Sequence, residues 1–118
     1  MRPHERLEVW KKAIDFVVAI YRTTEGFPKE EKFGLTSLRI AAVSIPANIA
    51  EGAGRKSLKE FAYILSNSQG SASEVETELL IASRLNYLPE AKYLSLRSAL
   101  DEIGRMITGL GRHLEQKP

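Results

Sequence analysis

The stretch SLKEFAYILSNSQGSASEVETELLIA, residues 57–82, predicts most directly how this chain folds. Its small and apolar residues recur three and four positions apart, the spacing that places side chains on one side of an α-helix. The members of this stripe are Leu58, Phe61, Leu65, Ser68, Ala72, Val75, Leu79 and Ala82. The stripe is the longest in the chain, and it predicts a helix over residues 57–87.

The start and the centre of this helix carry further signals. Ser57 and Glu60 form a Ser-x-x-Glu capping box, in which each side chain can satisfy a free backbone N–H of the first turn. The centre, residues 66–73, is rich in serine and contains Gly70, and both residue types are poor helix formers. We therefore expect close backbone packing of this centre against the small residues Ala41, Ala42, Ser44 and Ala47.

The preceding helix is predicted over residues 29–52, with its stripe at Leu35, Leu38, Ala42, Ile45 and Ile49. Pro28 is placed to open it, since a proline in the first turn lacks only an N–H that would be unpaired anyway. Pro46 falls inside the stripe, where a proline costs ~3 kcal/mol and usually bends a helix. We expect a kink there, and a helix end at Gly52, because glycine can adopt the left-handed closing conformation.

Two more helices complete the pattern. The first, over residues 4–25, has a stripe at Leu7, Trp10, Ile14, Val17 and Tyr21, and the last, over residues 90–115, has one at Leu96, Leu100, Ile103, Ile107, Leu110 and Leu114. Four helices with short connections favour an antiparallel up-down-up-down bundle. The 118 residues suit one all-α domain, residues 1–118.

Composition and the N-terminal sequence indicate where in the cell the protein is located. There is no cysteine, and no apolar run approaches the ~18 residues that a membrane span needs. The charged N-terminus does not resemble a secretory signal. These features predict a soluble, cytoplasmic protein without a membrane partner. The net charge is only +2, so the overall balance does not by itself indicate a polyanion partner.

The helix predicted over residues 4–25 has a second apolar seam, roughly 100° from its stripe. Val9, Ala13, Phe16 and Ile20 form this seam. A broad core face would explain it, and so would a surface used in self-association, helped by Leu80 and Ile81. Under the second alternative we expect Val9, Phe16 and Ile20 at the contact between copies.

Residues able to perform chemistry do not gather in recognisable motifs. His4 and His113 have no partner at metal-ligand spacing, and the serines lack a neighbouring base. We therefore predict a protein that is not an enzyme and has no metal or cofactor. Glu74, Glu76 and Glu78 form an acidic group, in which Glu74 and Glu78 lie four residues apart and repel each other on an isolated helix. This favours a cationic partner, for which Arg39 is the candidate, and the alternative is a solvated acidic face.

The segment AVSIPANIAEG, residues 42–52, followed by Arg55, has a distinctive pattern. Together with LEVW at residues 7–10, FPKEE at 27–31, Leu35-Thr36-Ser37, Gly70-Ser71 and Glu74, it resembles the four-helix-bundle proteins encoded by intervening sequences in bacterial 23S rRNA genes. The chain departs from this pattern at Leu38-Arg39-Ile40, where many relatives have a glutamine and an arginine pair.

The resemblance implies a bacterial bundle that assembles into homopentamers. It also implies kinship with the accessory proteins of diversity-generating retroelements, similar bundles thought to engage nucleic acid and a reverse transcriptase. It implies no established activity for the intervening-sequence proteins themselves. Two functions therefore remain open, a module that binds RNA or DNA and a scaffold that binds another protein without touching nucleic acid.

A basic pole would serve the first of these functions. In an up-down-up-down bundle, the starts of the first and third helices share one pole with the ends of the second and fourth. That pole collects Arg2, Arg6, Arg55, Lys56, Lys59, Arg112 and Lys117, opposed by Glu5, Glu8, Glu51, Glu60 and Glu115. A ring of copies would repeat this small excess, and affinity for a polyanion grows with the number of phosphates neutralised. The alternative is that these cations only complement helix ends or stay solvated.

Overall fold

The computed structural model describes residues 1–116, except for the side chains of residues 31–35. Its α-helices are α1 Glu8–Thr24, α2 Lys32–Ala53, α3 Leu58–Arg84 and α4 Glu90–Gln116. The 3-10 helices η1 Pro3–Arg6 and η2 Lys29–Glu31 lead into α1 and α2. The described residues contain no strand and the helices pack on one another, so the predicted all-α four-helix bundle is confirmed.

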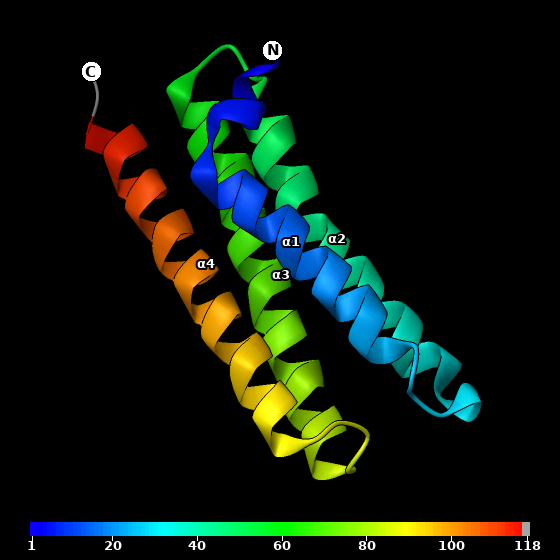
Figure 1. The fold of residues 1–118 in the computed structure, drawn as a ribbon. Helices are drawn as coiled ribbons and strands as arrows, with labels where there is room; N and C mark the ends of the chain where they lie inside the picture. The colour runs from blue at the N-terminus through cyan, green and yellow to red at the C-terminus, as the bar shows by residue number, and fades with distance from the viewer. Residues whose placement is uncertain (117–118) are drawn as a thin grey trace.

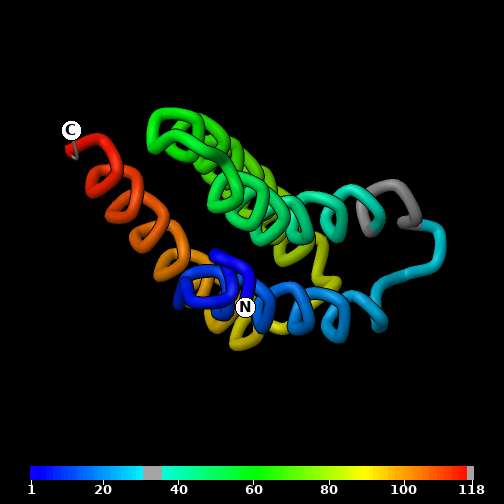
Figure 2. Tube along the Cα trace, turned by 90° about the horizontal axis from the view of Figure 1, so that it is seen from above, coloured from blue at the N-terminus to red at the C-terminus, as the bar shows by residue number. Residues whose placement is uncertain are grey.

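Successive helices run in opposite directions along an elongated body of 49 × 22 × 21 Å (Figure 1). The N-terminus, the turn between α2 and α3 and the end of α4 lie toward one end, which we call the α2–α3 turn end. Seen from above, α2 lies along α3, while α1 and the end of α4 are separate from that pair at this end (Figure 2). Helix α1 packs on α2 and α4, and α3 packs on α2 and α4.

The core follows most of the predicted stripes. From α2, Leu38, Ala42, Ile45 and Ile49 are buried, and from α3, Leu65, Ser68, Ala72, Val75, Leu79 and Ala82 are buried. Helix α4 adds Leu96, Leu100, Ile103, Ile107 and Leu114. Leu58 is an exception, because it is exposed at the start of α3. Leu35 lies outside the described side chains.

Of the two alternatives for the second seam of α1, the structure supports the broad core face, and the expected contact between copies at this seam was wrong. Val9, Phe16 and Ile20, expected between copies, are at most 4% exposed and belong to the core of the single chain. Ile14 and Tyr21, expected in the core, are instead exposed, and Trp10 is half-buried against the ring of His4. The burial of this seam accounts for the rotation of α1, and on the same side Lys12 forms a 2.8 Å surface ion pair with Glu102 of α4.

The contact between α2 and α3 has two close points. The buried Ser68 hydroxyl donates to the Ile45 carbonyl oxygen at 3.0 Å. At Gly52, an added Cβ would lie 2.8 Å from the Phe61 ring, so the glycine permits close approach. No described glycine has a positive φ, which corrects the expectation that Gly52 closes α2 in a left-handed conformation. Helix α2 continues through Pro46 to Ala53, and the kink at Pro46 stays a prediction.

Gly70 does not have the role that its small neighbours suggested. It is exposed, and a Cβ added there would meet nothing within 4 Å. The expectation that α2 packs closely on Gly70 was therefore wrong, although Ser68 and Ala72 on the opposite side do face the core. Helix α3 therefore packs closely on α2 only through its buried side, which includes Ser68.

Both ends of α3 are determined locally. Ser57 Oγ accepts from the Glu60 backbone N–H at 3.0 Å, which confirms the predicted start of the helix. At the other end Asn86 has φ 62°, and the N–H groups of Asn86 and Tyr87 donate to the carbonyls of Ser83 and Ala82. This pair of bonds is a Schellman closure, in which a residue with left-handed conformation ends the helix.

The predicted pairing of Arg39 with Glu74 and Glu78 was also wrong. Arg39 points to α1, where its guanidinium donates to Thr24 Oγ1 and the Tyr21 carbonyl and lies 4.5 Å above the Tyr21 ring. Glu76, between these two glutamates in sequence, points to α4 instead and pairs with Arg97 at 3.1 Å. The reason is the rotation of α2, which turns Arg39 toward α1 and away from α3.

Glu74 and Glu78 form no ion pair among the described residues. The Ser37 hydroxyl lies 3.5 Å from Glu74 Oε1, and Glu78 Oε2 is buried without a hydrogen bond. Burial raises the pKa of the Glu78 carboxyl, the charge of Glu74 adds to the rise, and Ser37 opposes it. Glu78 is therefore a carboxylate whose ionisation is disfavoured by folding.

Candidate interaction surfaces

The described cations predicted for the basic pole lie at or near the α2–α3 turn end, but they do not form one cluster. Arg2 and Arg6 are exposed beside the start of α1, and Arg112 is exposed on the last turns of α4. Arg112 borders a groove between α3 and α4 together with Gln69 and Arg105. Lys117 lies outside the described residues.

The densest group of these cations is the α2–α3 turn, where Arg55, Lys56 and Lys59 are all exposed. Arg55 pairs with Glu51 at 2.7 Å, and both side chains are about half exposed, so this surface ion pair contributes ~1 kcal/mol or less. Neither Lys56 nor Lys59 has an ion pair in the described part of the chain. Two ammonium groups are thus free to meet an anion.

The start of α3 adds a positive field to this group. Ser57 Oγ satisfies the backbone N–H of Glu60, whereas the N–H groups of Leu58 and Lys59 have no acceptor within the helix. The aligned peptide dipoles of a helix place a partial positive charge at this end, which favours anions. The turn therefore attracts anions more strongly than its formal charges, three cations against Glu51 and Glu60, would indicate.

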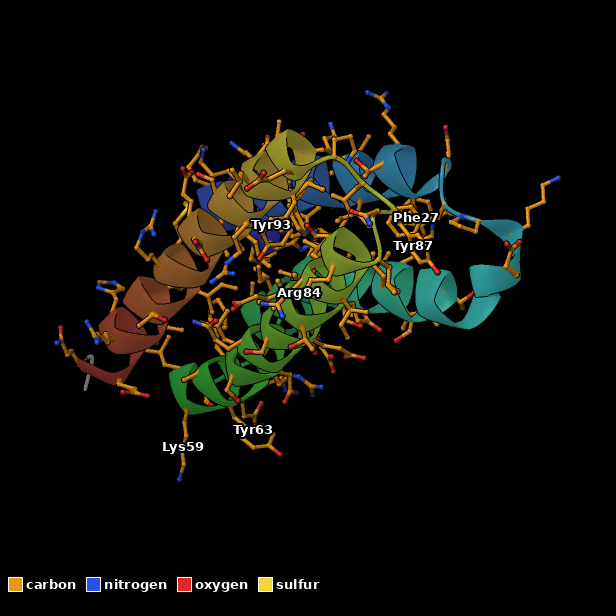
Figure 3. All side chains as sticks on the ribbon, turned by 90° about the horizontal axis from the view of Figure 1, so that it is seen from below. Phe27, Lys59, Tyr63, Arg84, Tyr87 and Tyr93 are labelled. Carbon is orange, nitrogen blue, oxygen red and sulfur yellow. The ribbon has the colours of Figure 1, made fainter. Side chains whose placement is uncertain are left out.

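An exposed aromatic side chain, which the sequence reasoning missed, accompanies these cations. Tyr63 is 73% exposed, one helical turn after Lys59. Figure 3 shows both side chains projecting from α3 in the same direction, away from the bundle. The signal was present in the sequence, since Tyr63 lies opposite the apolar stripe of α3 and four positions after a lysine.

A second surface is apolar and spans α1 and α2. Ile14, Val18 and Tyr21 are exposed on one side of α1, and Ile40 and Val43 are exposed on α2. Helix α1 packs on α2, and the guanidinium of Arg39 joins α2 to the Tyr21 ring at one end of the α1 row. We call these residues the α1–α2 apolar face. Exposed apolar side chains gathered on two neighbouring helices are typical of a protein interaction site.

Comparison with known proteins identifies the family. The profile of the 23S rRNA-intervening sequence proteins matches residues 5–109, which is most of the chain. The chain belongs to this family. A solved structure of a protein of unknown function, from the S23 ribosomal protein family of Bacteroides thetaiotaomicron, is similar at 25% identity with a TM-score of 0.80. The similarity covers 86% of this chain and 96% of that one. No curated protein matches the chain in sequence.

The family match covers only part of the predicted basic pole. The α2–α3 turn, Tyr63 and the α1–α2 apolar face lie within residues 5–109, while Arg2 and Arg112 lie outside. Among the described residues, no three potential ligands gather as a metal site would require, and no helix is long and apolar enough to cross a membrane. The two candidate surfaces of this intervening-sequence protein are therefore the α2–α3 turn and the α1–α2 apolar face.

Proposed function

We propose that this 23S rRNA-intervening sequence protein is a non-enzymatic, self-assembling module that binds nucleic acid through the cations of its α2–α3 turn. The observation that carries the proposal is the pair Lys56 and Lys59, exposed, without an ion pair in the described residues, and adjacent to the positive end of α3. Phosphate groups are the anions that such a backbone-and-ammonium site suits, and contacts to phosphates supply most of non-specific nucleic-acid affinity.

Self-assembly strengthens this proposal. One chain offers only a few free cations, and a monomer would bind phosphates weakly. The α1–α2 apolar face gives copies a surface on which to associate, distinct from the α2–α3 turn, so that assembly leaves the cations accessible. A closed ring, the pentamer that the family resemblance implies, would repeat the turn in every subunit, and affinity rises with the number of simultaneous contacts.

The test compares wild type with an Arg55→Glu, Lys56→Glu, Lys59→Glu variant for binding to structured RNA and to duplex DNA at low salt. A matched control reverses three exposed cations at the other end of the bundle, Arg22→Glu, Arg84→Glu and Lys92→Glu, which lie near the end of α1, at the end of α3 and near the start of α4. We expect the turn variant to lose binding and the control to keep most of it.

Equal binding by wild type and the turn variant would contradict the proposal, and so would a lack of binding to structured RNA, duplex DNA and single strands alike. The alternative, a scaffold for another protein, predicts that partners captured from native lysate are unaffected by nuclease treatment. The nucleic-acid proposal predicts that nuclease removes them.

A further inference from the structure

Tyr63 is the most exposed aromatic side chain among those that the structure describes. The other exposed tyrosine, Tyr21, is covered by the guanidinium of Arg39, whereas no ring or cation in the described residues covers Tyr63. An uncovered ring of 73% exposure buries little apolar area, so its contribution to the folding of the single chain is small. Its surroundings indicate what it can bind.

Two grooves meet at Tyr63. One runs between α2 and α3 and is bordered by Arg55, Lys59 and Asn67. The other runs between the start of α3 and the end of α4 and is bordered by Leu58, Ser66 and Leu114. The ring thus stands between two grooves that both include Lys59 in their lining, with the uncharged hydrogen-bonding side chains of Ser66 and Asn67 on the next turn.

This combination of a free ring and nearby cations distinguishes between forms of nucleic acid. The faces of a base inside a duplex are already stacked, so only an unpaired base can stack on a protein ring. Side chains four apart on a helix are ~5–6 Å apart at Cβ, which lets Lys59 meet a phosphate of the strand whose base lies on Tyr63. A surface that used only phosphates would need no exposed ring.

We propose that Tyr63 is a stacking platform for an unpaired base, and that the ligand of the α2–α3 turn is single-stranded nucleic acid, with Lys59 and Lys56 contacting its phosphates. This inference rests on the proposed function and specifies its ligand. Stacking on an aromatic ring tolerates any base, so binding has little sequence preference. Beside the ring, the Asn67 amide can donate a hydrogen bond to a base edge, and the Ser66 hydroxyl, which donates to the Tyr63 carbonyl, can accept one.

The test uses an unstructured oligonucleotide of roughly 16 nucleotides, the upper site size of one single-strand-binding domain, as RNA and as DNA, with a duplex of the same sequence. Tyr63→Ala should weaken single-strand binding about tenfold, Tyr63→Phe should bind as wild type, and neither should change duplex binding. The exposure of Tyr63 makes both variants compatible with the fold, which circular dichroism checks. The RNA and DNA arms determine which strand is preferred.

A second readout follows the ring itself. In a Tyr63→Trp variant, single strands should quench the new indole fluorescence, whereas the duplex should not, and wild type provides the Trp10 background. Equal single-strand affinities for Tyr63→Ala and wild type would overturn the inference, as would an equal loss on the duplex. If either of these results is found but a Lys56→Glu, Lys59→Glu variant loses all binding, the proposed function stands and only the stacking role of Tyr63 fails. If wild type binds neither single strand nor duplex, both fail.

Discussion

Arg39 Nε donates to Thr24 Oγ1 at 2.9 Å, and the same guanidinium donates to the Tyr21 carbonyl at 3.1 Å, so a side chain of α2 holds the last turn of α1. Thr24 is buried, and its hydroxyl donates onward to the Ile20 carbonyl at 2.8 Å. A guanidinium also complements the negative end of the α1 dipole. Arg39 is therefore a fixed link between two helices.

Replacement of Arg39 by alanine should lower the free energy of unfolding by about 1.5 kcal/mol, because a buried hydroxyl loses a charged donor. Arg39→Lys should recover only part of this, since an ammonium cannot occupy both acceptors in the planar geometry of arginine. Urea unfolding measures both. Arg84→Ala, at an exposed position without an ion pair in the described residues, is the control and should stay within ~0.5 kcal/mol of wild type. Equal stability of Arg39→Ala and Arg84→Ala would refute the link.

Two glycines should respond in opposite directions to the same substitution. Gly52→Ala places a methyl group 2.8 Å from Phe61 Cδ1 and 3.2 Å from the Phe61 carbonyl oxygen, and should destabilise the protein by ~1–3 kcal/mol. Gly70→Ala meets open space in the middle of a helix and should stabilise by up to ~1 kcal/mol, the difference in helix propensity. Thermal unfolding measures the melting temperatures of both variants. A change of the same sign in both would contradict the close approach of Gly52 to Phe61.

Glu78 makes stability depend on pH. Its pKa is raised in the folded state, first by burial, so the folded protein binds a proton more readily than the unfolded chain. Stability associated with this group is therefore fully present below the unfolded pKa and is lost as pH rises through the folded pKa. Glu78→Gln should raise the melting temperature at pH 7 and change it little at pH 4. Glu90→Gln, exposed at the start of α4, is the control, and a gain for Glu78→Gln that persists equally at both pH values would contradict this account.

The α1–α2 apolar face should be the contact between copies. Val18→Glu and Ile40→Glu each place a charge on this face, at side chains 43% and 62% exposed, and should leave folded monomers in sedimentation velocity. Leu94→Glu, at a side chain of 56% exposure on α4, should assemble as wild type does. A wild-type chain that sediments as a monomer at micromolar concentration would exclude the contact altogether.

Much of the fold could be predicted because its signals are local. The start of α3 depends on Ser57 and Glu60 alone, and the stripes of α2, α3 and α4 are single and unambiguous. The turn to α4 was placed within three residues, although the left-handed closure at Asn86 was not foreseen. Short-range hydrogen bonds and helix periodicity are sufficient for these features.

The errors concern orientation between helices, which a single sequence determines poorly. Helix α1 has two apolar seams of similar strength, and periodicity gives the angle between them but not which one faces the bundle. For Arg39 the sequence offers possible acceptors on both neighbouring helices, and only the rotation of α2, which the sequence does not determine, directs it to Thr24. Tyr63 lies on the side of α3 opposite the apolar stripe, where helix periodicity predicts exposure but no function.

The central claim is that phosphates bind at the α2–α3 turn, and the salt dependence of binding tests it most directly. The logarithm of the association constant for an unstructured oligonucleotide should fall linearly with the logarithm of salt concentration. In a Lys56→Gln, Lys59→Gln variant the slope should become shallower by about 1.4 for each chain that contacts the strand, because each lost phosphate contact on a single strand removes ~0.7. Identical slopes for the variant and wild type would show that these two lysines do not neutralise phosphates, which would contradict the account.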